Sequence, residues 1–251
     1  MSDTPPTDQG RWIRAALVIF PAGTILLGIA SFGIWQWKKD RAEDRSFKYA
    51  LALRKTATAE RLQRHAEIIR ESLSKTDWLL SIPGYLESTM GAENMGYSVR
   101  RTRGADEAWS NIDAELTGKT RPREIIMALT LYDDDSAQRQ STALAISEML
   151  SVAHEITGES VVSTLRFAVI PNKTEALQQV RELLRHHDER LMHLFILGGA
   201  SDVAQQRVQA SLETTPHGTR VVARTACATP QEALRSAQEL KTLLLQAAGR
   251  P

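Results

Sequence analysis

The longest apolar stretch of the chain, residues 15–37, carries no charged side chain. An α-helix rises about 1.5 Å per residue, so this stretch can cross a hydrocarbon core of about 30 Å. Aromatic residues that favour the headgroup level stand at its two ends: Trp12, Trp35 and Trp37. A cleaved secretory signal is the alternative, but its apolar region would be only about 7–15 residues long. The pattern therefore predicts a retained single-pass transmembrane helix over residues 12–37, in contact with the lipid bilayer through 15–37.

Polar sequence precedes this segment, and helix-forming sequence follows it. We expect residues 1–11 to be a disordered tail. Residues 40–76 are rich in Ala, Leu, Arg, Glu and Lys, and their apolar positions fall on one stripe, which predicts a helical stalk. The sequence Ile82-Pro83-Gly84 is expected to break this helix, and Tyr85 to Met90 predicts a short second one. The predicted organisation is a tail over 1–11, a transmembrane helix over 12–37, a helical stalk with the first domain helix over 38–80, and a folded domain over 81–251.

From Gly96 onward the pattern changes to strands that alternate with helices. Strands are predicted at Tyr97–Val99 and Ser110–Leu116, and the nearly continuous apolar run 124–131 is typical of a strand buried on both faces. The later elements are a helix over 141–157, a strand over 164–170, a helix over 174–187, a strand over 191–197, a helix over 201–213, a strand over 220–224 and a helix over 230–248. This alternation predicts an α/β fold, a three-layer α/β/α sandwich with a mostly parallel, mixed central sheet.

Composition excludes some functions and leaves the side of the membrane open. The chain has 31 Lys and Arg against 30 Asp and Glu, so no basic excess points to a nucleic-acid partner. Its single cysteine, Cys227, excludes an intramolecular disulfide and a cysteine-based zinc site. More Lys and Arg follow the apolar stretch than precede it, and the positive-inside rule then favours a cytoplasmic C-terminal part.

The carboxyl ends of the buried strands are where α/β sheets place their sites. The first such end carries three consecutive carboxylates, residues 133–135, directly after the run 124–131. Carboxylates can ligate metals, but the ordinary interpretation is a solvated loop in which one aspartate caps the next helix.

Several segments, taken in order, resemble a known enzyme family. They are RLQRHAEIIRESL, YLESTMGAENMGYSV, SNIDAELTGKTRPREIIMALTLYD and TLRFAVIPNKTE. None is specific alone, but over roughly residues 60–200 the ordered set resembles the zinc-dependent aminopeptidases of clan MH, which include bacterial leucyl aminopeptidases and glutaminyl cyclases. The resemblance implies the same sandwich fold. It also implies two zinc ions held by His, Asp and Glu, which activate a water and polarise the scissile carbonyl with a second Glu as general base.

The chain departs from this family where the metal ligands should stand. Leu131 occupies the position of the first histidine, and Arg139 that of the bridging aspartate. Lys173 and Thr174 occupy the positions of the paired glutamates. Asp133 matches, but in the family this aspartate supports the histidine rather than binding metal. Because a guanidinium cannot ligate zinc and its charge repels the ion, we interpret the chain as a degenerate, catalytically inactive member with no expected cofactor.

The sequence thus predicts a membrane-anchored, aminopeptidase-like domain that acts as a binding or interaction module for an unidentified protein or peptide-like ligand. Arg139 and Lys173 are the predicted ligand-binding residues, because two cations in a vestigial cleft would favour carboxylates or other anions. Members of the family usually act outside the cytoplasm, so the resemblance slightly favours an extracytoplasmic domain, against the count of flanking charges.

Two alternatives remain open at this point. In the first, the protein is a membrane-bound metallo-aminopeptidase with displaced ligands and zinc as its cofactor. Asp133 and Glu175 are then the catalytic candidates, and Asp133, Asp135 and His217 the metal candidates. In the second, the role is architectural, and the helix over 40–76 pairs with another copy as a coiled coil.

Overall fold

The computed structural model describes residues 31–32, 34–36, 38, 49, 51–105, 107–133, 135–198, 202–212 and 218–249. The chain divides into two compact units, residues 1–48 and 49–251, and every element below belongs to the second unit. The predicted tail and most of the predicted transmembrane segment lie outside the described residues. Within the described ranges, no helix combines the length and the apolar character needed to cross a bilayer.

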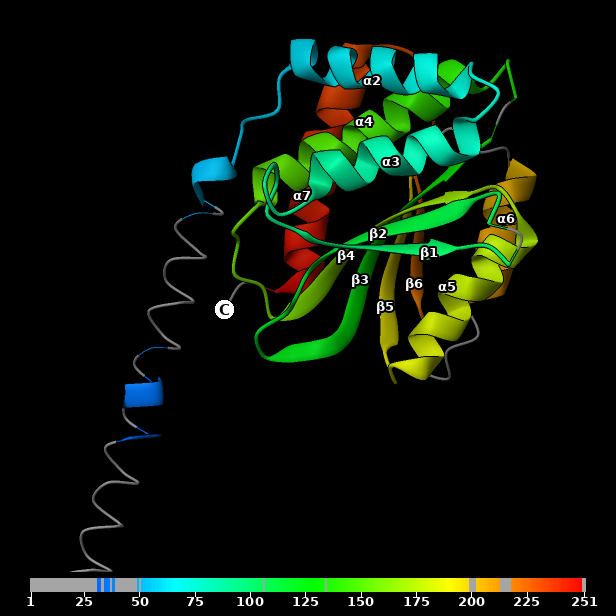
Figure 1. Ribbon diagram of the computed structural model, residues 1–251. Helices are drawn as coiled ribbons and strands as arrows, with labels where there is room; N and C mark the ends of the chain where they lie inside the picture. The colour runs from blue at the N-terminus through cyan, green and yellow to red at the C-terminus, as the bar shows by residue number, and fades with distance from the viewer. Residues whose placement is uncertain are drawn as a thin grey trace, which may run out of the picture. The chain divides into compact units, whose positions relative to one another are not determined.

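Six strands form one mixed sheet (Figure 1). They are β1 (Ser98–Arg103), β2 (Ser110–Leu116), β3 (Arg121–Tyr132), β4 (Ser163–Pro171), β5 (Arg190–Ile196) and β6 (Arg220–Ala223). Their order across the sheet is β1-β2-β4-β3-β5-β6. The four strands from β4 to β6 run parallel, whereas β2 is antiparallel to both β1 and β4. This confirms the predicted mixed, mostly parallel sheet.

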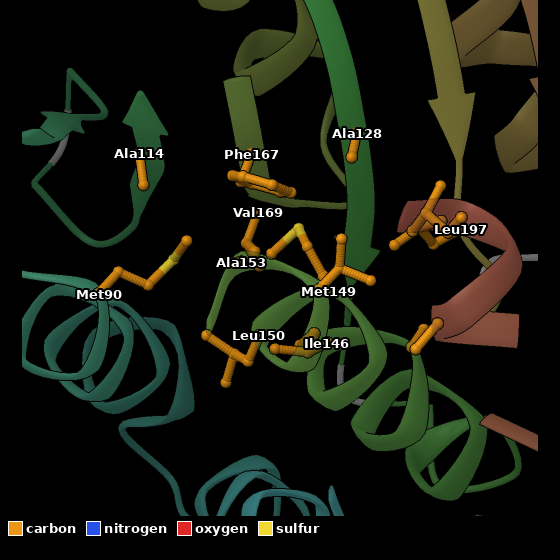
Figure 2. Packing of buried hydrophobic residues seen from close by; sticks show 14 of the residues in the cluster. Met90, Ala114, Ala128, Ile146, Met149, Leu150, Ala153, Phe167, Val169 and Leu197 are labelled. Carbon is orange, nitrogen blue, oxygen red and sulfur yellow. The ribbon is translucent and has the colours of Figure 1, made fainter. Parts of the chain in front are cut away.

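Helices cover both faces of the sheet (Figure 1). One face packs against α3 (Trp78–Met90), α4 (Arg139–Ile156) and α7 (Pro230–Ala248), and the other against α5 (Thr174–His186) and α6 (Asp202–Leu212). Side chains alternate along β4, so Phe167 and Val169 enter the first core while Ala168 and Ile170 enter the second. In Figure 2, Met149 of α4 extends toward Val169. The predicted three-layer sandwich is confirmed.

The helix predicted over 40–76 is interrupted, and its second half belongs to the core. Residues 54–58 are not helical, and α2 (Ala59–Leu73) begins where the Thr58 hydroxyl accepts a hydrogen bond from the backbone N–H of Arg61. Helix α2 lies over α4, α7 and α3 (Figure 1). Its apolar stripe is fully buried at Leu62 and Ile69, so this stripe covers the domain's own helices and is not available for a coiled coil.

The segment before α2, residues 54–57, is bonded to the C-terminal end of α4, and we call it the strap. The Arg54 Nε atom donates to the backbone oxygen of Thr157 at 2.9 Å. The backbone N–H of Ala57 donates to Glu155 Oε1 at 2.8 Å. The last turn of a helix leaves carbonyl groups without intrahelical partners, and the strap satisfies part of this need.

The predicted helix break at Pro83 is wrong. Helix α3 runs from Trp78 to Met90 through Pro83, and the chain turns earlier, at residues 74–77. Proline in the second turn removes one N–H that would have bonded within the helix. Ile82 and Leu86 beside it are fully buried, and their packing compensates for the missing hydrogen bond.

Candidate functional site

Asp133 lies at the carboxyl end of β3, where the sequence placed a candidate site. Its Oδ2 atom accepts a hydrogen bond from Asn172 Nδ2 at 2.8 Å, just beyond the end of β4. Its Oδ1 atom accepts from the backbone N–H of Asp135 at 3.1 Å. Asp133 therefore ties the ends of two neighbouring parallel strands together, and both of its oxygens are engaged.

Asp135 shapes the loop that leads into α4. Its Oδ1 atom accepts from the backbone N–H of Ala137 at 2.9 Å, and its Oδ2 atom accepts from Gln138 Nε2 at 3.1 Å. The N-cap position of α4 is Gln138, whose side chain makes no capping hydrogen bond. The expected helix cap is therefore not formed by Asp133 or Asp135, and these two carboxylates stabilise turns instead.

Lys173 and Glu175 lie at the start of α5. Lys173 is the N-cap residue, and its Nζ atom lies 5.9 Å from the ring centroid of the buried Trp109, within cation–π range. Glu175 is exposed in the first turn, where the positive end of the helix dipole favours a carboxylate. Each residue has a structural role that needs no ligand.

Arg139 is the first residue of α4 and lines an open groove of about 760 Å³ against α2. Arg64 and Arg70 of α2 line the same groove, whereas Lys173 is not part of its lining. The two predicted ligand-binding residues therefore face different surroundings. Their joint role in one anion-binding cleft stays a prediction.

The candidate metal ligands do not converge in the part of the chain that the structure describes. No group of three or more His, Cys, Asp or Glu side chains there is arranged to hold a metal ion. His217 lies outside the described residues, as does Asp134.

A histidine pair that the sequence analysis did not identify lies where α2, α3 and α4 meet. The rings of His65 and His154 are 6.3 Å apart, and a hydrogen bond of 2.6 Å joins His65 Nδ1 to the Tyr85 hydroxyl. The pKa of each histidine is lowered to about 4, first by burial and then by nearby positive charges that include Arg61 and Lys55. The available signal was His154 near the end of the helix predicted over 141–157.

Arg166 is a second residue that the sequence did not single out, because it lies inside a strand predicted as buried. A buried charged side chain is a common feature of functional sites. Its side chain is 2% exposed. It donates two hydrogen bonds to Glu189, at 2.7 and 2.8 Å, and one to Glu115 at 2.8 Å. Burial would raise the pKa of Glu115, but the bonds from Arg166 hold it below its ordinary value. The network connects β2, β4 and the residue before β5, and its carboxylates are already paired, so we assign it a structural role.

A third buried polar group joins α4 to α7. Glu148 is 2% exposed and accepts a hydrogen bond from the Ser236 hydroxyl at 2.7 Å. Burial raises the pKa of the Cys227 thiol, and the Glu148 carboxylate raises it further. A raised pKa disfavours the thiolate, which is the nucleophilic form of cysteine.

No protein-family model and no curated protein matches the sequence. Solved structures do share its architecture. A putative Zn-dependent exopeptidase from Bacteroides vulgatus has a TM-score of 0.55 at 8% identity, covering 76% of this chain and 97% of that one. The LapA aminopeptidase of Legionella pneumophila has a TM-score of 0.47 at 8% identity, covering 78% of this chain. The glutaminyl cyclase of Macrostomum lignano has a TM-score of 0.40 at 16% identity, covering 75% of this chain and 78% of that one.

The exopeptidase from Bacteroides vulgatus carries the fold assignment. At 8% identity its likeness establishes the fold of the sandwich, and this fold is the one that the sequence resemblance implied. The present chain spans 60% of the length of the LapA aminopeptidase.

Proposed function

We propose that this chain is a membrane-anchored, non-catalytic domain of exopeptidase-like fold that binds a protein or peptide-like ligand. The proposal rests mainly on Leu131, which the sequence resemblance places where a zinc-binding histidine would stand. Leu131 is 2% exposed and packs in the apolar core beneath α5 and α6. A side chain held in this way cannot supply a metal ligand.

The neighbouring donor set does not fit a pair of zinc ions either. Zinc takes thiolates, imidazoles and carboxylates at about 2.0–2.3 Å. Lys173 carries a positive charge where the resemblance expects a glutamate, and it lies over the ring of Trp109. Both oxygens of Asp133 accept hydrogen bonds from Asn172 and from the backbone of Asp135. We therefore assign no catalytic step to zinc in this domain.

The membrane anchor is the second part of the proposal. The uncharged stretch 15–37, with tryptophans at its ends, supports it. The fold resemblance favours a domain outside the cytoplasm, whereas the flanking lysines and arginines favour the cytoplasmic side. A reporter fused after Pro251 measures the orientation directly. Activity of an alkaline phosphatase fusion indicates an outside domain, and fluorescence of a green fluorescent protein fusion indicates an inside one.

The first test is the zinc content of the purified full-length chain. After dialysis against trace zinc we expect less than about 0.1 equivalent per chain, because the described residues bring no three zinc donors together at the ends of β3 and β4. We also expect no hydrolysis of leucine p-nitroanilide above the buffer rate. About two equivalents of zinc, with hydrolysis that is lost in D133N, would overturn the proposal and restore the displaced-ligand hydrolase.

A further inference from the structure

The groove at Arg139 is part of a longer hollow that follows α2. The section of about 760 Å³ is lined by α2 and the start of α4, with Arg64, Arg70 and Arg139 in its wall. A second section of about 300 Å³ adjoins it, because Glu67, Arg70 and Gln140 line both. This second section ends at Pro230 and Gln231, the first residues of α7. The hollow thus lies along α2 and reaches the first residues of α4 and α7.

Some charged side chains of the hollow have hydrogen-bond or ion-pair partners, and others do not. Three of them have partners on α2 or just beyond its end: Arg64 with Glu60 at 3.5 Å, Glu71 with Lys75 at 3.3 Å, and Glu67 with the Gln63 amide at 2.9 Å. Arg70 and Arg139 have no hydrogen-bond or ion-pair partner in the described part of the chain. The Gln63 amide is neutral and leaves the charge of Glu67 uncompensated, so Arg70 and Arg139 together give the hollow an excess of one positive charge.

Arg139 is held at the groove wall at an energetic cost. Its Nε atom is buried and has no hydrogen-bond partner within the described residues. A buried donor that is left unsatisfied is destabilising. The N-terminal end of α4 carries the positive end of the helix dipole. No acidic residue in the first turn of α4 offsets this positive potential. An anionic ligand in the groove would pair with Arg139 and Arg70 together.

The rest of the lining indicates which anion fits. Gln63, Gln140 and Gln231 carry amides that can both donate and accept, as a peptide backbone requires. Ile68, which is 38% exposed, provides apolar contact in the same hollow. A compact phosphate would use only the two arginines, whereas an extended peptide with a carboxylate would use the whole hollow. Guanidinium groups bind carboxylates through paired, charge-assisted hydrogen bonds.

We propose that the hollow between α2, α4 and α7 binds an acidic peptide segment, with Arg70 and Arg139 pairing its carboxylates. This inference rests on the proposed function and names the ligand class of the binding module. It replaces the pairing of Arg139 with Lys173, because Arg70 lines the same groove as Arg139 and Lys173 does not.

The test is binding of rhodamine-labelled tetraglutamate to the full-length chain, measured by fluorescence anisotropy at fixed low ionic strength. We expect saturable binding, with labelled tetraglutamine at least about tenfold weaker. The variant R70Q/R139Q should weaken tetraglutamate binding about tenfold or more, since two charge-assisted pairs are lost. The matched control R181Q/R190Q removes the same charge from exposed positions outside the hollow, and it should leave binding unchanged.

Three results would overturn the inference. One is the lack of saturable tetraglutamate binding up to about 1 mM, an affinity already too weak to be specific. Another is an equal loss in the two arginine variants, which would indicate bulk charge alone. The third is displacement of the peptide by inorganic phosphate at a lower concentration than by unlabelled tetraglutamate, which would make phosphate the ligand. None of these results restores zinc catalysis, which only metal content and hydrolysis measure.

Discussion

The histidines at residues 65 and 154 show how a single side chain couples this domain to solution pH. His154 is 5% exposed, and its pKa of about 4 lies well below the ordinary value of about 6.5. His65 shares this shift, and the cations around the pair, Lys55, Arg61 and Arg64, disfavour a further positive charge. Both rings are therefore neutral in the folded domain at neutral pH.

We expect the domain to lose stability as the pH falls from about 6.5 to about 4. In this window the unfolded chain binds protons at both histidines and the folded chain does not, so the free energy of unfolding decreases with decreasing pH. Urea denaturation of the full-length chain at pH 7.5, 6.0 and 4.5 measures the effect. His154→Phe should reduce the dependence on pH, whereas His186→Gln, at an exposed position, should not. Equal slopes in the wild type and in His154→Phe would show that the pair does not control acid stability.

Among the helices, α2 gains its stability from the domain rather than from its own sequence. Leu62, Ile69 and Leu73 are at most 1% exposed, although the sequence pattern alone predicted a helical stalk that leads into the first helix of the domain. A single apolar stripe indicates that a helix packs against something, but it does not identify the surface. Here that surface is provided by α4 and α7.

The neighbours Ile68 and Ile69 offer a matched test of this packing. Ile69 is fully buried and Ile68 is 38% exposed in the same helix, so Ile→Ala has the same effect on helix propensity at both. Ile69→Ala should lower the free energy of unfolding by about 2–5 kcal/mol, through lost burial and a cavity. Ile68→Ala should cost less than about 1 kcal/mol. Denaturant melts of the two variants decide the point, and similar losses would mean that α2 is not docked as described.

At the scale of whole elements, the sequence predicted most of the domain and missed specific junctions. The strand Ser110–Leu116 matches β2, and from residue 139 onward every predicted helix and strand is present with ends shifted by at most two residues. Their apolar periodicity is long and uninterrupted, which makes it a strong signal. Pro83 misled because its local preference for a helix end is weaker than the burial of Ile82 and Leu86 around it.

The candidate site was harder to predict than the fold, because its meaning depends on side-chain partners. The positions of Asp133 and Lys173 at strand ends were correct, but their partners Asn172 and Trp109 could not be read from spacing. Arg166 is hidden for a similar reason. Its partners Glu115 and Glu189 lie on other segments and reach it only through the sheet topology.

In the whole molecule, the Arg166 network connects the antiparallel part of the sheet to its parallel part. Glu115 lies on the antiparallel strand β2, and Glu189 directly precedes the parallel strand β5, which is not a neighbour of β4. One guanidinium therefore connects both sides of β4. This connection matters because β2 pairs with β1, which is the edge strand of the sheet that the described residues form.

Arg166→Met should destabilise the domain by about 3–5 kcal/mol, since it leaves carboxylates without their partner in a mostly buried site. The exposed pair Arg123–Asp188 provides the control, and Arg123→Met should cost less than about 1 kcal/mol. The measurement is the midpoint of urea denaturation at pH 7.5. A loss of stability below about 1 kcal/mol in Arg166→Met would contradict a central role for this network.

The strap determines how the domain would respond to a pulling force. Tension that arrives from any part of the chain before residue 54 meets the bonds of Arg54 to Thr157 and Glu159, and of Ala57 to Glu155, before it reaches α2. Those bonds pass the load to the end of α4, which is buried along most of its length between the sheet and α2. The most deeply packed helix of the domain is thus its mechanical anchor, and α2 is shielded from being peeled off first.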